Sequence, residues 1–176
     1  MDKKESPCFN MPMKKKSVQI VLVSDNHGSR EPLEYVRRIH ADADSFIHCG
    51  DVELPTYLVD GFAVVQGNND NYQQFPARRI IELGEHRIYV CHGHRDMFFG
   101  HFDMLSEKAK AEGCDIVFFG HTHILFDKTI GGVRVINPGS IWMNRDGSEP
   151  SYMIVTLKGK TISVERKTFQ KSDLKK

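Results

Sequence analysis

Five short polar segments carry the residues of this sequence that could do chemistry. Each combines aspartate, asparagine or histidine side chains, and glycines stand beside these side chains in four of the five. The segments are Asp25-Asn26-His27, Gly50-Asp51, Gly67-Asn68-Asn69-Asp70, His92-Gly93-His94 and Gly120-His121-Thr122-His123. Imidazole nitrogens mixed with carboxylate and amide oxygens suit borderline or hard divalent ions. The pattern therefore predicts a metal centre.

Seven of these side chains form the candidate ligand set: Asp25, His27, Asp51, Asn68, His92, His121 and His123. Seven ligands exceed the needs of one ion, whereas two ions that share a carboxylate use them all, with Asp51 as the natural bridge. Two ions about 3.5 to 4 Å apart can hold a hydroxide between them and clamp a phosphate for in-line displacement. The predicted reaction is hydrolysis of a phosphate ester. Manganese is the first choice of ion, and nickel, iron and zinc are alternatives.

His94 lies beside this set without belonging to it. It could contact the phosphate or support a ligand from behind, and both roles stay open. Ser140 lacks a G-x-S-x-G setting and is not expected to be a nucleophile. The remaining histidines are interpreted as surface or core residues: His40, His48, His86 and His101.

The elements that must position these segments follow an α/β pattern. The β-branched run 18–23 predicts a strand buried on both faces. Apolar residues at three- and four-residue spacing over 31–43 predict an amphipathic helix. Further strands are expected at 45–48, 62–65, 79–83, 87–91 and 115–119, with helical segments at 54–59 and 104–113. Each polar segment directly follows a strand. Because the carboxyl ends of parallel strands collect ligands, the five segments are expected to converge.

Alternation with a period of two takes over in the C-terminal half. It predicts successive antiparallel strands at 125–129, 133–136, 152–157 and 161–165, and Gly84-Glu85 predicts a hairpin between 79–83 and 87–91. The architecture is therefore expected to be mixed. At a spacing of two, extended backbone would direct the Asp25/His27 and His121/His123 pairs to one side. The glycines at 50, 67 and 120 are expected to let the backbone turn sharply.

Length and charge favour one globular domain over residues 17–169. The 176 residues include 24 basic and 23 acidic side chains, so the net charge is too small to indicate nucleic acid as a binding partner. Nucleic acid stays open as a substrate. No apolar run approaches the roughly 20 residues of a membrane helix. Residues 1–16, with Met11 and Met13 as alternative starts, are expected to be disordered, and residues 170–176 to fray. Four cysteines without a C-x-x-C pair favour reduced thiols in a soluble, cytoplasmic protein.

In their order along the chain, Asp25-x-His27, Gly50-Asp51, Gly67-Asn68, His92 and Gly120-His121-x-His123 resemble the calcineurin-like metallophosphoesterase family. Compact size, His92-Gly93-His94 and Asn137-Pro138-Gly139-Ser140 are most similar to its small bacterial and archaeal phosphodiesterase branch, over about residues 18–169. The resemblance implies a four-layer α/β/β/α sandwich with mixed sheets. It also implies a first ion bound by Asp25, His27, Asp51 and His123, and a second bound by Asp51, Asn68, His92 and His121.

One position departs from the pattern that this resemblance implies. Many members have Gly-Asn-His, where the histidine assists the leaving group or holds the phosphate, and this sequence has Asn69 instead. An amide cannot act as a general acid. A phosphodiester with a good leaving group is therefore the expected substrate. The catalytic candidates are His94, as a substitute for the missing histidine, and Asn68.

Several alternatives stay open at this point. The family includes a retromer subunit of similar size that serves as a protein-binding scaffold, so a catalytically weak scaffold is the alternative function. His92-x-His94-x-Asp96 is similar to a metallo-β-lactamase motif, but Met97 stands where that motif has histidine. Cyclic nucleotides, nucleic-acid ends and lipid headgroup esters are all possible substrates. Phe98, Phe99 and Phe102 could cover the site, form a subunit contact in a homo-oligomer, or belong to the core.

Overall fold

The structure is a computed structural model that describes residues 17–71, 74–98, 100–170 and 172–175. The predicted disordered segment 1–16, with Met11, Met13 and Cys8, lies outside the described residues, as does Phe99. The domain boundaries proposed from the sequence therefore stay a prediction.

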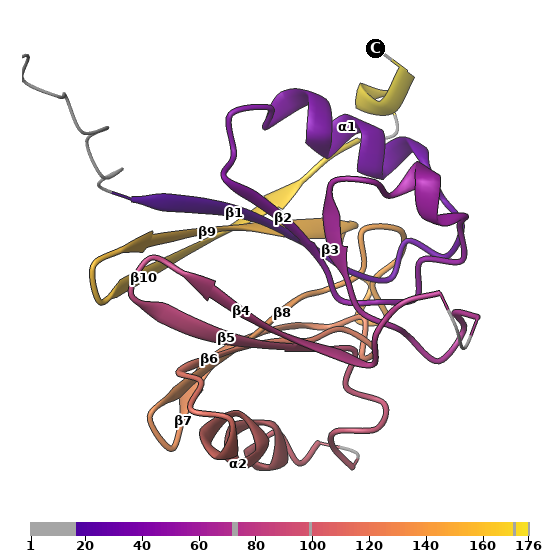
Figure 1. Cartoon of the computed structure of the whole chain (residues 1–176). Coiled ribbons are helices and arrows are strands. Elements are labelled where there is room, and N and C mark those ends of the chain that lie inside the picture. The colour runs from indigo at the N-terminus through magenta and orange to yellow at the C-terminus, as the bar shows by residue number, and fades with distance from the viewer. Residues whose placement is uncertain (1–16, 72–73, 99, 171, 176) are drawn as a thin grey trace, which may run out of the picture.

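Two five-stranded mixed sheets face each other in the centre of the molecule (Figure 1). The first has the order β10 (Thr161–Thr168), β9 (Ser151–Lys158), β1 (Val18–Val23), β2 (Ser45–His48) and β3 (Phe62–Val64). The second has the order β4 (Arg78–Leu83), β5 (His86–Cys91), β6 (Ile116–Phe118), β8 (Val133–Pro138) and β7 (Leu125–Ile130). The strands β1, β2 and β3 are mutually parallel, as are β5, β6 and β8. The other neighbouring pairs are antiparallel: β10 with β9, β9 with β1, β4 with β5, and β8 with β7.

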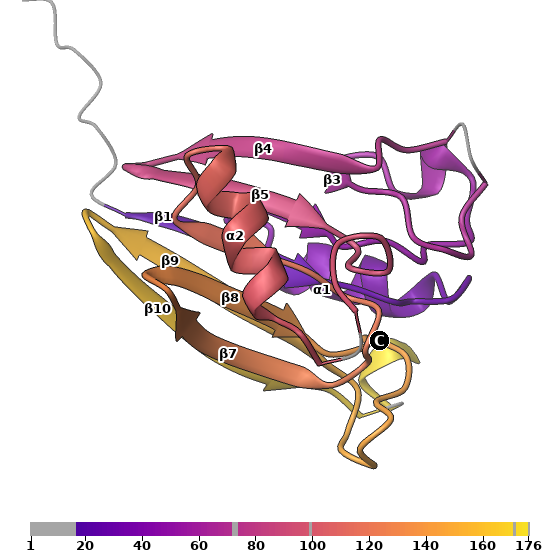
Figure 2. The same ribbon diagram turned by 90° about the horizontal axis from the view of Figure 1, so that it is seen from below.

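One helix covers the outer face of each sheet. Helix α1 (Glu31–Ile39) lies on the first sheet, with the 3₁₀ helices η1 (Thr56–Leu58) and η2 (Asp173–Lys175) on the same side (Figure 1). Figure 2 shows α2 (Asp103–Ala111) lying across the second sheet. The four layers are thus α/β/β/α, which confirms the fold class. Within the described ranges no helix has the length and apolar character needed to span a membrane.

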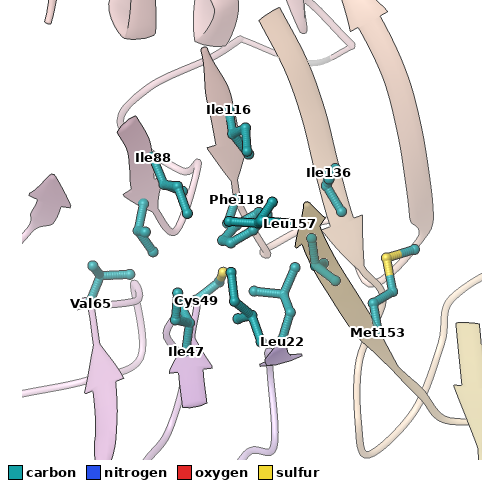
Figure 3. Packing of buried hydrophobic residues seen from close by; sticks show 13 residues of the cluster. Leu22, Ile47, Cys49, Val65, Ile88, Ile116, Phe118, Ile136, Met153 and Leu157 are labelled. Atoms are coloured by element: carbon teal, nitrogen blue, oxygen red, sulfur yellow. The ribbon is translucent and has the colours of Figure 1, made fainter. Parts of the chain in front are cut away.

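Three apolar clusters hold the layers together. The pleat of β1 sends Ile20 and Leu22 into the cluster between the sheets, shown in Figure 3, and Val21 and Val23 into the cluster under α1. A third cluster joins α2 to the second sheet. Full burial of each such side chain contributes about 1.5 to 3 kcal/mol. The prediction of a strand buried on both faces is confirmed, and the thiols of Cys49, Cys91 and Cys114 are free and buried.

Three expectations about the elements need correction. The predicted C-terminal strands are antiparallel within the pairs β7–β8 and β9–β10, but the first pair belongs to the second sheet and the second pair to the first sheet, so they do not all pair in succession. Helix α1 ends at Ile39, four residues before the predicted end. The C-terminal segment expected to fray contains η2, and its Leu174 packs against the cluster under α1.

Candidate metal centre

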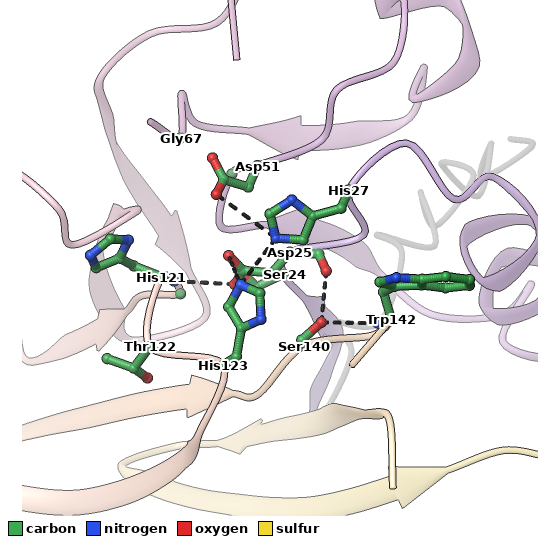
Figure 4. A network of polar contacts seen from close by, with 12 residues as sticks. Ser24, Asp25, His27, Asp51, Gly67, His121, Thr122, His123, Ser140 and Trp142 are labelled. Carbon is green, nitrogen blue, oxygen red and sulfur yellow. Dashed lines mark hydrogen bonds and ion pairs between the residues drawn. The ribbon is translucent and has the colours of Figure 1, made fainter. Parts of the chain in front are cut away.

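The five polar segments meet at one edge of the sandwich. They follow β1, β2 and β3 of the first sheet and β5 and β6 of the second, so the carboxyl ends of parallel strands from both sheets share this edge. Figure 4 shows His27, His121 and His123 gathered around the carboxylates of Asp25 and Asp51. The predicted convergence therefore occurs between two sheets, which the strand pattern alone did not indicate.

Left-handed backbone, and not extended backbone, aims the ligands. Five of the seven candidates have positive φ: Asp25 (55°), His27 (42°), Asp51 (55°), His121 (67°) and His123 (55°). This conformation costs a non-glycine residue roughly 1 to 2 kcal/mol. The spacing of two correctly predicted that the Asp25/His27 and His121/His123 pairs reach one centre. The predicted cause, extended backbone, was wrong. The surrounding packing must stabilise these strained turns.

The first group of candidate ligands comprises Asp25, His27 and His123. The Nε2 atom of His123 lies 3.2 Å from Asp25 Oδ1 and 3.0 Å from His27 Nε2. Asp25 Oδ1 is fully buried and makes no hydrogen bond to the part of the chain that the structure describes. A buried carboxylate oxygen without a donor, beside two imidazole nitrogens that face each other, fits a bound cation.

The second group forms around Asp51 and His92. The Nε2 atom of His92 lies 3.4 Å from Asp51 Oδ2 and 3.1 Å from Asn68 Oδ1, and His121 Nδ1 lies 3.0 Å from the same Asn68 oxygen. Asp51 Oδ2 is also 4.0 Å from His27 Nε2, so this carboxylate lies between the two groups. Asp25 Oδ1, 3.9 Å from His92 Nε2, approaches the second group as well. The structure thus brings all seven predicted ligands together.

Three imidazoles are oriented so that one ring nitrogen of each is directed toward the candidate metal centre. In His27, His92 and His123 the Nδ1 atom faces an oxygen acceptor, which fixes the proton there and turns Nε2 toward the centre. The acceptors are Glu53 Oε1 for His27 (2.5 Å), the Cys49 carbonyl for His92 (2.6 Å) and the Met143 carbonyl for His123 (3.1 Å). Sequence reasoning missed Glu53, which lies two residues after Asp51.

Electrostatics at the centre favour anionic carboxylates. Burial raises the pKa of Asp25, but His123 and His92 outweigh it and lower the pKa overall. The pKa of Asp51 is also lowered despite burial, because the neighbouring His92 and the hydrogen bonds from Asn69 stabilise its anionic form. Burial opposes a charge on His92, yet Asp51 and Asp25 raise its pKa. Two buried anions among imidazoles form the environment that a divalent cation needs.

Two further side chains hold the carboxylates in place. The Ser24 hydroxyl donates to Asp25 Oδ2 at 2.5 Å. Asn69 donates from its backbone nitrogen and from Nδ2 to the two oxygens of Asp51, each at 2.8 Å. The residue that departs from the family pattern is therefore committed to orienting Asp51, which accounts for an amide at this position.

Asp70 clamps the segments after β2 and β3 together. Its buried carboxylate accepts four backbone N–H groups: those of Asp51, Val52, Glu53 and Gly67. These bonds stabilise the left-handed turn that carries Asp51 and Glu53. The acidic residue that ends Gly67-Asn68-Asn69-Asp70 was visible in the sequence, but a hydrogen-bonding role of this kind depends on tertiary structure.

Asn137 and Ser140 support the segments after β6 and β1. Asn137 Nδ2 donates to the Gly120 carbonyl at 2.7 Å, and the Ser140 hydroxyl donates to the Asp25 carbonyl at 2.7 Å. Ser140 Oγ also accepts from the backbone nitrogen of Met143 at 2.8 Å. Ser140 is fully buried, and its hydroxyl is engaged in these hydrogen bonds.

Glycine is required at this edge chiefly because side chains would collide. A Cβ on Gly67 would lie 2.1 Å from Asp51 Oδ1, and one on Gly120 would lie 2.0 Å from Ser24 Oγ. Neither residue has positive φ, whereas Gly50 does, at 96°. The predicted sharp turn therefore applies to Gly50. At the other two positions the cause is close packing of neighbouring chain segments.

The four histidines that the sequence assigned to the surface or the core lie where hydrogen bonds can satisfy them or solvent can reach them. His48 is buried, donates from Nε2 to Asn26 Oδ1 and accepts the Gly50 N–H at Nδ1, and burial lowers its pKa to about 4. His86 is buried at the opposite end of the sheets, and His40 bonds to the Tyr152 hydroxyl. His101 is exposed.

His94 lies at the margin of the centre. Its ring centroid is 5.3 Å from that of His92 and 6.1 Å from that of His121. Its Nδ1 atom is buried and has no hydrogen-bond partner in the described ranges. Burial, followed by the nearby His92 and Arg95, lowers the pKa of His94 to about 4. A neutral imidazole with an unsatisfied nitrogen therefore borders the site.

The metallo-β-lactamase-like motif is not assembled. Asp96 accepts hydrogen bonds from the Tyr89 hydroxyl at 3.0 Å and from Lys108 Nζ at 3.1 Å. Its carboxylate is therefore committed to β5 and α2.

Comparisons with known proteins agree with the fold and the motifs. Residues 18–160 match the model of the calcineurin-like phosphoesterase superfamily domain. A probable metallophosphoesterase of Bacillus subtilis, YsnB, is 35% identical over 150 residues, which cover 84% of this chain and 89% of that protein.

Two solved structures extend the comparison. A predicted phosphoesterase from Streptococcus pneumoniae is 33% identical with a TM-score of 0.81, covering 86% of this chain and 90% of its own. Vacuolar Protein Sorting 29 from Cryptosporidium parvum is 21% identical with a TM-score of 0.71, covering 89% and 100%, a likeness that shows the fold alone. By its motifs, its four-layer fold and its matched length, this chain belongs to the calcineurin-like phosphoesterase superfamily.

Proposed function

We propose that this protein is a two-metal-dependent phosphodiesterase. Asp25, His27, Asp51 and His123 would hold one divalent ion, and Asp51, Asn68, His92 and His121 the other. The observation that carries the proposal is Asp25 Oδ1, a buried oxygen that has no donor in the described structure and faces two imidazole nitrogens. Manganese as the native ion and a cytoplasmic location belong to the same proposal.

The chain's own residues would position the reacting groups. When bound, the ions would supply an activated water molecule and neutralise charge on the phosphate. Glu53, Cys49 and Met143 hold three imidazoles with Nε2 toward the centre. Asn69 and Ser24 fix the carboxylates, so the ligands do not need to reorganise when the phosphate binds.

The preference for a diester with a good leaving group rests on the family resemblance together with the chemistry of the Asn69 side chain. This side chain donates to Asp51 and has no proton to give a leaving group. A substrate whose leaving group departs without an acid is therefore favoured. We propose that His94, with its unpartnered Nδ1, contacts the phosphate or the leaving oxygen.

Leaving-group dependence tests the role of His94. His94→Ala should lower kcat/KM about 10- to 100-fold for poor leaving groups and much less for 4-nitrophenolate, the size of effect typical of one positioned acid or hydrogen-bond donor. His101→Ala, which changes an exposed histidine, is the matched control. Equal losses for all leaving groups would assign His94 to support of the neighbouring ligands.

A protein-binding scaffold is the second candidate function. It is favoured by the likeness to Vacuolar Protein Sorting 29 and by two apolar side chains exposed beside the centre, Trp142 (46%) and Met143 (61%). A scaffold has no need for strained, buried carboxylates aimed at imidazoles. We therefore rank it below the enzyme.

The deciding experiment measures metal content and hydrolysis together. Metal-stripped protein would receive Mn²⁺, Ni²⁺ or Zn²⁺ and then an aryl phosphodiester or the matching monoester. We expect diester cleavage that depends on metal and falls at least about a thousandfold in Asp51→Asn, because the shared ligand is lost. Asp60→Asn, which changes an exposed aspartate, should retain the wild-type rate. Two bound ions without turnover of any ester would favour the scaffold, and no bound metal would overturn both.

A further inference from the structure

A pocket of about 490 Å³ opens directly beside the metal centre. His94 and His121 form its wall on the metal side. Its other walls come from residues 97, 98, 100 and 102 before α2 and from the start of β7. Figure 4 shows His121 and Thr122, both of which line the pocket, on the side of the carboxylates opposite Trp142. A phosphate held at the centre would therefore have one of its ester oxygens next to the pocket mouth.

The pocket lining is apolar away from the metal centre. Met97, Leu125 and Phe126 line it together with Phe98 and Ile124, whose side chains are 74% and 44% exposed at the rim. Two of the lining rings, those of Phe102 and Phe126, pack against each other with their centroids 4.1 Å apart. A preformed apolar wall of this kind favours a ligand group that brings no hydrogen-bonding edge.

The polar lining groups lie on the side of the metal centre. Thr122 and Arg145 join the two histidines there. Arg145 donates from Nη1 to the His121 carbonyl at 3.3 Å, and its backbone nitrogen donates to the His123 carbonyl at 3.0 Å. These bonds anchor a cation at the pocket mouth, where a phosphate would lie. The pocket thus has a charged end at the centre and an apolar end away from it.

We infer that this pocket binds the apolar substituent of the substrate, so that the substrate class is a phosphate ester of an alkyl or aryl alcohol. The inference rests on the proposed function, and it disfavours the nucleotide substrates that the sequence left open. A nucleobase would bury its polar edge against Met97, Leu125 and Phe126 without partners. The volume falls in the range of small-molecule sites, about 300 to 1,000 Å³.

A series of alkyl 4-nitrophenyl phosphodiesters, from methyl to hexyl, tests the inference with metal-loaded protein. Because the leaving group is constant, differences report the retained substituent. We expect kcat/KM to rise about threefold to fourfold for each added methylene until the pocket is full. Ile124→Gln should flatten this dependence. Ile39→Gln, which changes an equally exposed isoleucine (44%) on α1, should keep the wild-type slope.

Binding provides a readout that does not need turnover. Calorimetry should show hexyl phosphate binding the metal-loaded protein more tightly than methyl phosphate, with the difference reduced in Ile124→Gln. Turnover that is independent of chain length, or preference for a nucleoside ester over the hexyl ester, would overturn the inference and leave the phosphodiesterase intact. Absence of turnover for every ester would overturn the proposed function. Equal binding of the two phosphates would then overturn the pocket assignment as well.

Discussion

The two ends of the sandwich bury histidines in different ways. At the end away from the metal centre, His86 Nδ1 lies 2.7 Å from Asp115 Oδ2 and its Nε2 lies 2.9 Å from the Gly159 carbonyl. Both ring nitrogens therefore face an oxygen acceptor. At the candidate centre, one ring nitrogen of His92 and one of His123 face a backbone carbonyl, and the other nitrogen of each ring faces side chains of the predicted ligand set.

This difference shows what marks a metal site in this fold. Burial does not, because His86 and His48 are as buried as the candidate ligands. The distinguishing feature is a polar atom that its surroundings leave unsatisfied, such as Asp25 Oδ1. Burying such an atom costs free energy, so it is expected only where a ligand or ion binds it.

The largest effect should come from filling the space at the metal edge. In Gly67→Ala the new Cβ would lie 2.1 Å from Asp51 Oδ1 and 2.2 Å from its backbone nitrogen, so this backbone must shift. We expect a loss of more than about 3 kcal/mol in the free energy of unfolding, together with loss of metal binding. Urea denaturation and metal analysis would measure both.

Gly113→Ala is the control away from the metal centre. Gly113 has φ of 69°, and a Cβ there would meet no atom within 4 Å in the described structure. Conformational strain should cost about 1 kcal/mol and leave metal binding unchanged. Equal losses of stability and of metal binding in Gly67→Ala and Gly113→Ala would contradict the claim that close packing at the metal edge positions Asp51.

The contrast between these glycines also shows where sequence reasoning stops. The strand 18–23 and the placement of ligands after strands were predictable, because periodicity and residue type are local signals. The division of the strands between two sheets was not predictable from these local signals, because it depends on the tertiary packing of each β-hairpin. Glu53 and the supporting role of Ser140 were missed for a similar reason. Their roles arise from contacts with His27 and Asp25, which are distant in the sequence.

The next effect concerns His48, whose folded-state pKa of about 4 lies below the ordinary 6.5. The unfolded chain therefore binds a proton more readily than the folded chain between these values. This contribution to stability is complete above pH 6.5 and is lost as the pH falls toward 4. Because a tenfold change in a protonation constant is worth about 1.4 kcal/mol, the loss should approach about 3 kcal/mol.

Comparison with His48→Gln isolates this contribution. The pKa of His92 is raised, so its protonation affects the free energy of unfolding with the opposite sign. Because His92 is present in both proteins, its contribution cancels when their stabilities are compared. Urea denaturation of metal-free protein at pH 7.5, 6 and 4.5 should show the stability advantage of the wild type shrinking with pH. A constant advantage would mean that His48 is not held neutral.

A smaller effect is expected from Glu53, which accepts a hydrogen bond from His27 Nδ1. Glu53→Gln keeps an oxygen acceptor but removes the charge that strengthens His27 as a ligand. Metal affinity should fall about 10- to 100-fold, or about 1.4 to 2.7 kcal/mol, which competition with a chelator would measure. Glu85→Gln, in the β4–β5 turn, is the exposed control. Equal affinities for the two variants would leave Glu53 without a role in metal binding.

The smallest effect on metal affinity should come from His86, and its size tests the comparison between the two ends. His86→Gln removes the contact with Asp115 or Gly159 and should cost about 1 to 3 kcal/mol of unfolding free energy. Metal affinity should stay within about twofold of wild type, because both nitrogens of His86 already face acceptors and no ligand depends on them. If His86→Gln lowered metal affinity as much as is expected for Glu53→Gln, the two ends of the sandwich would be coupled through the sheets. The strained turns at the metal edge would then depend on the far end of the sandwich, and not on Asp70, Asn137 and Ser140.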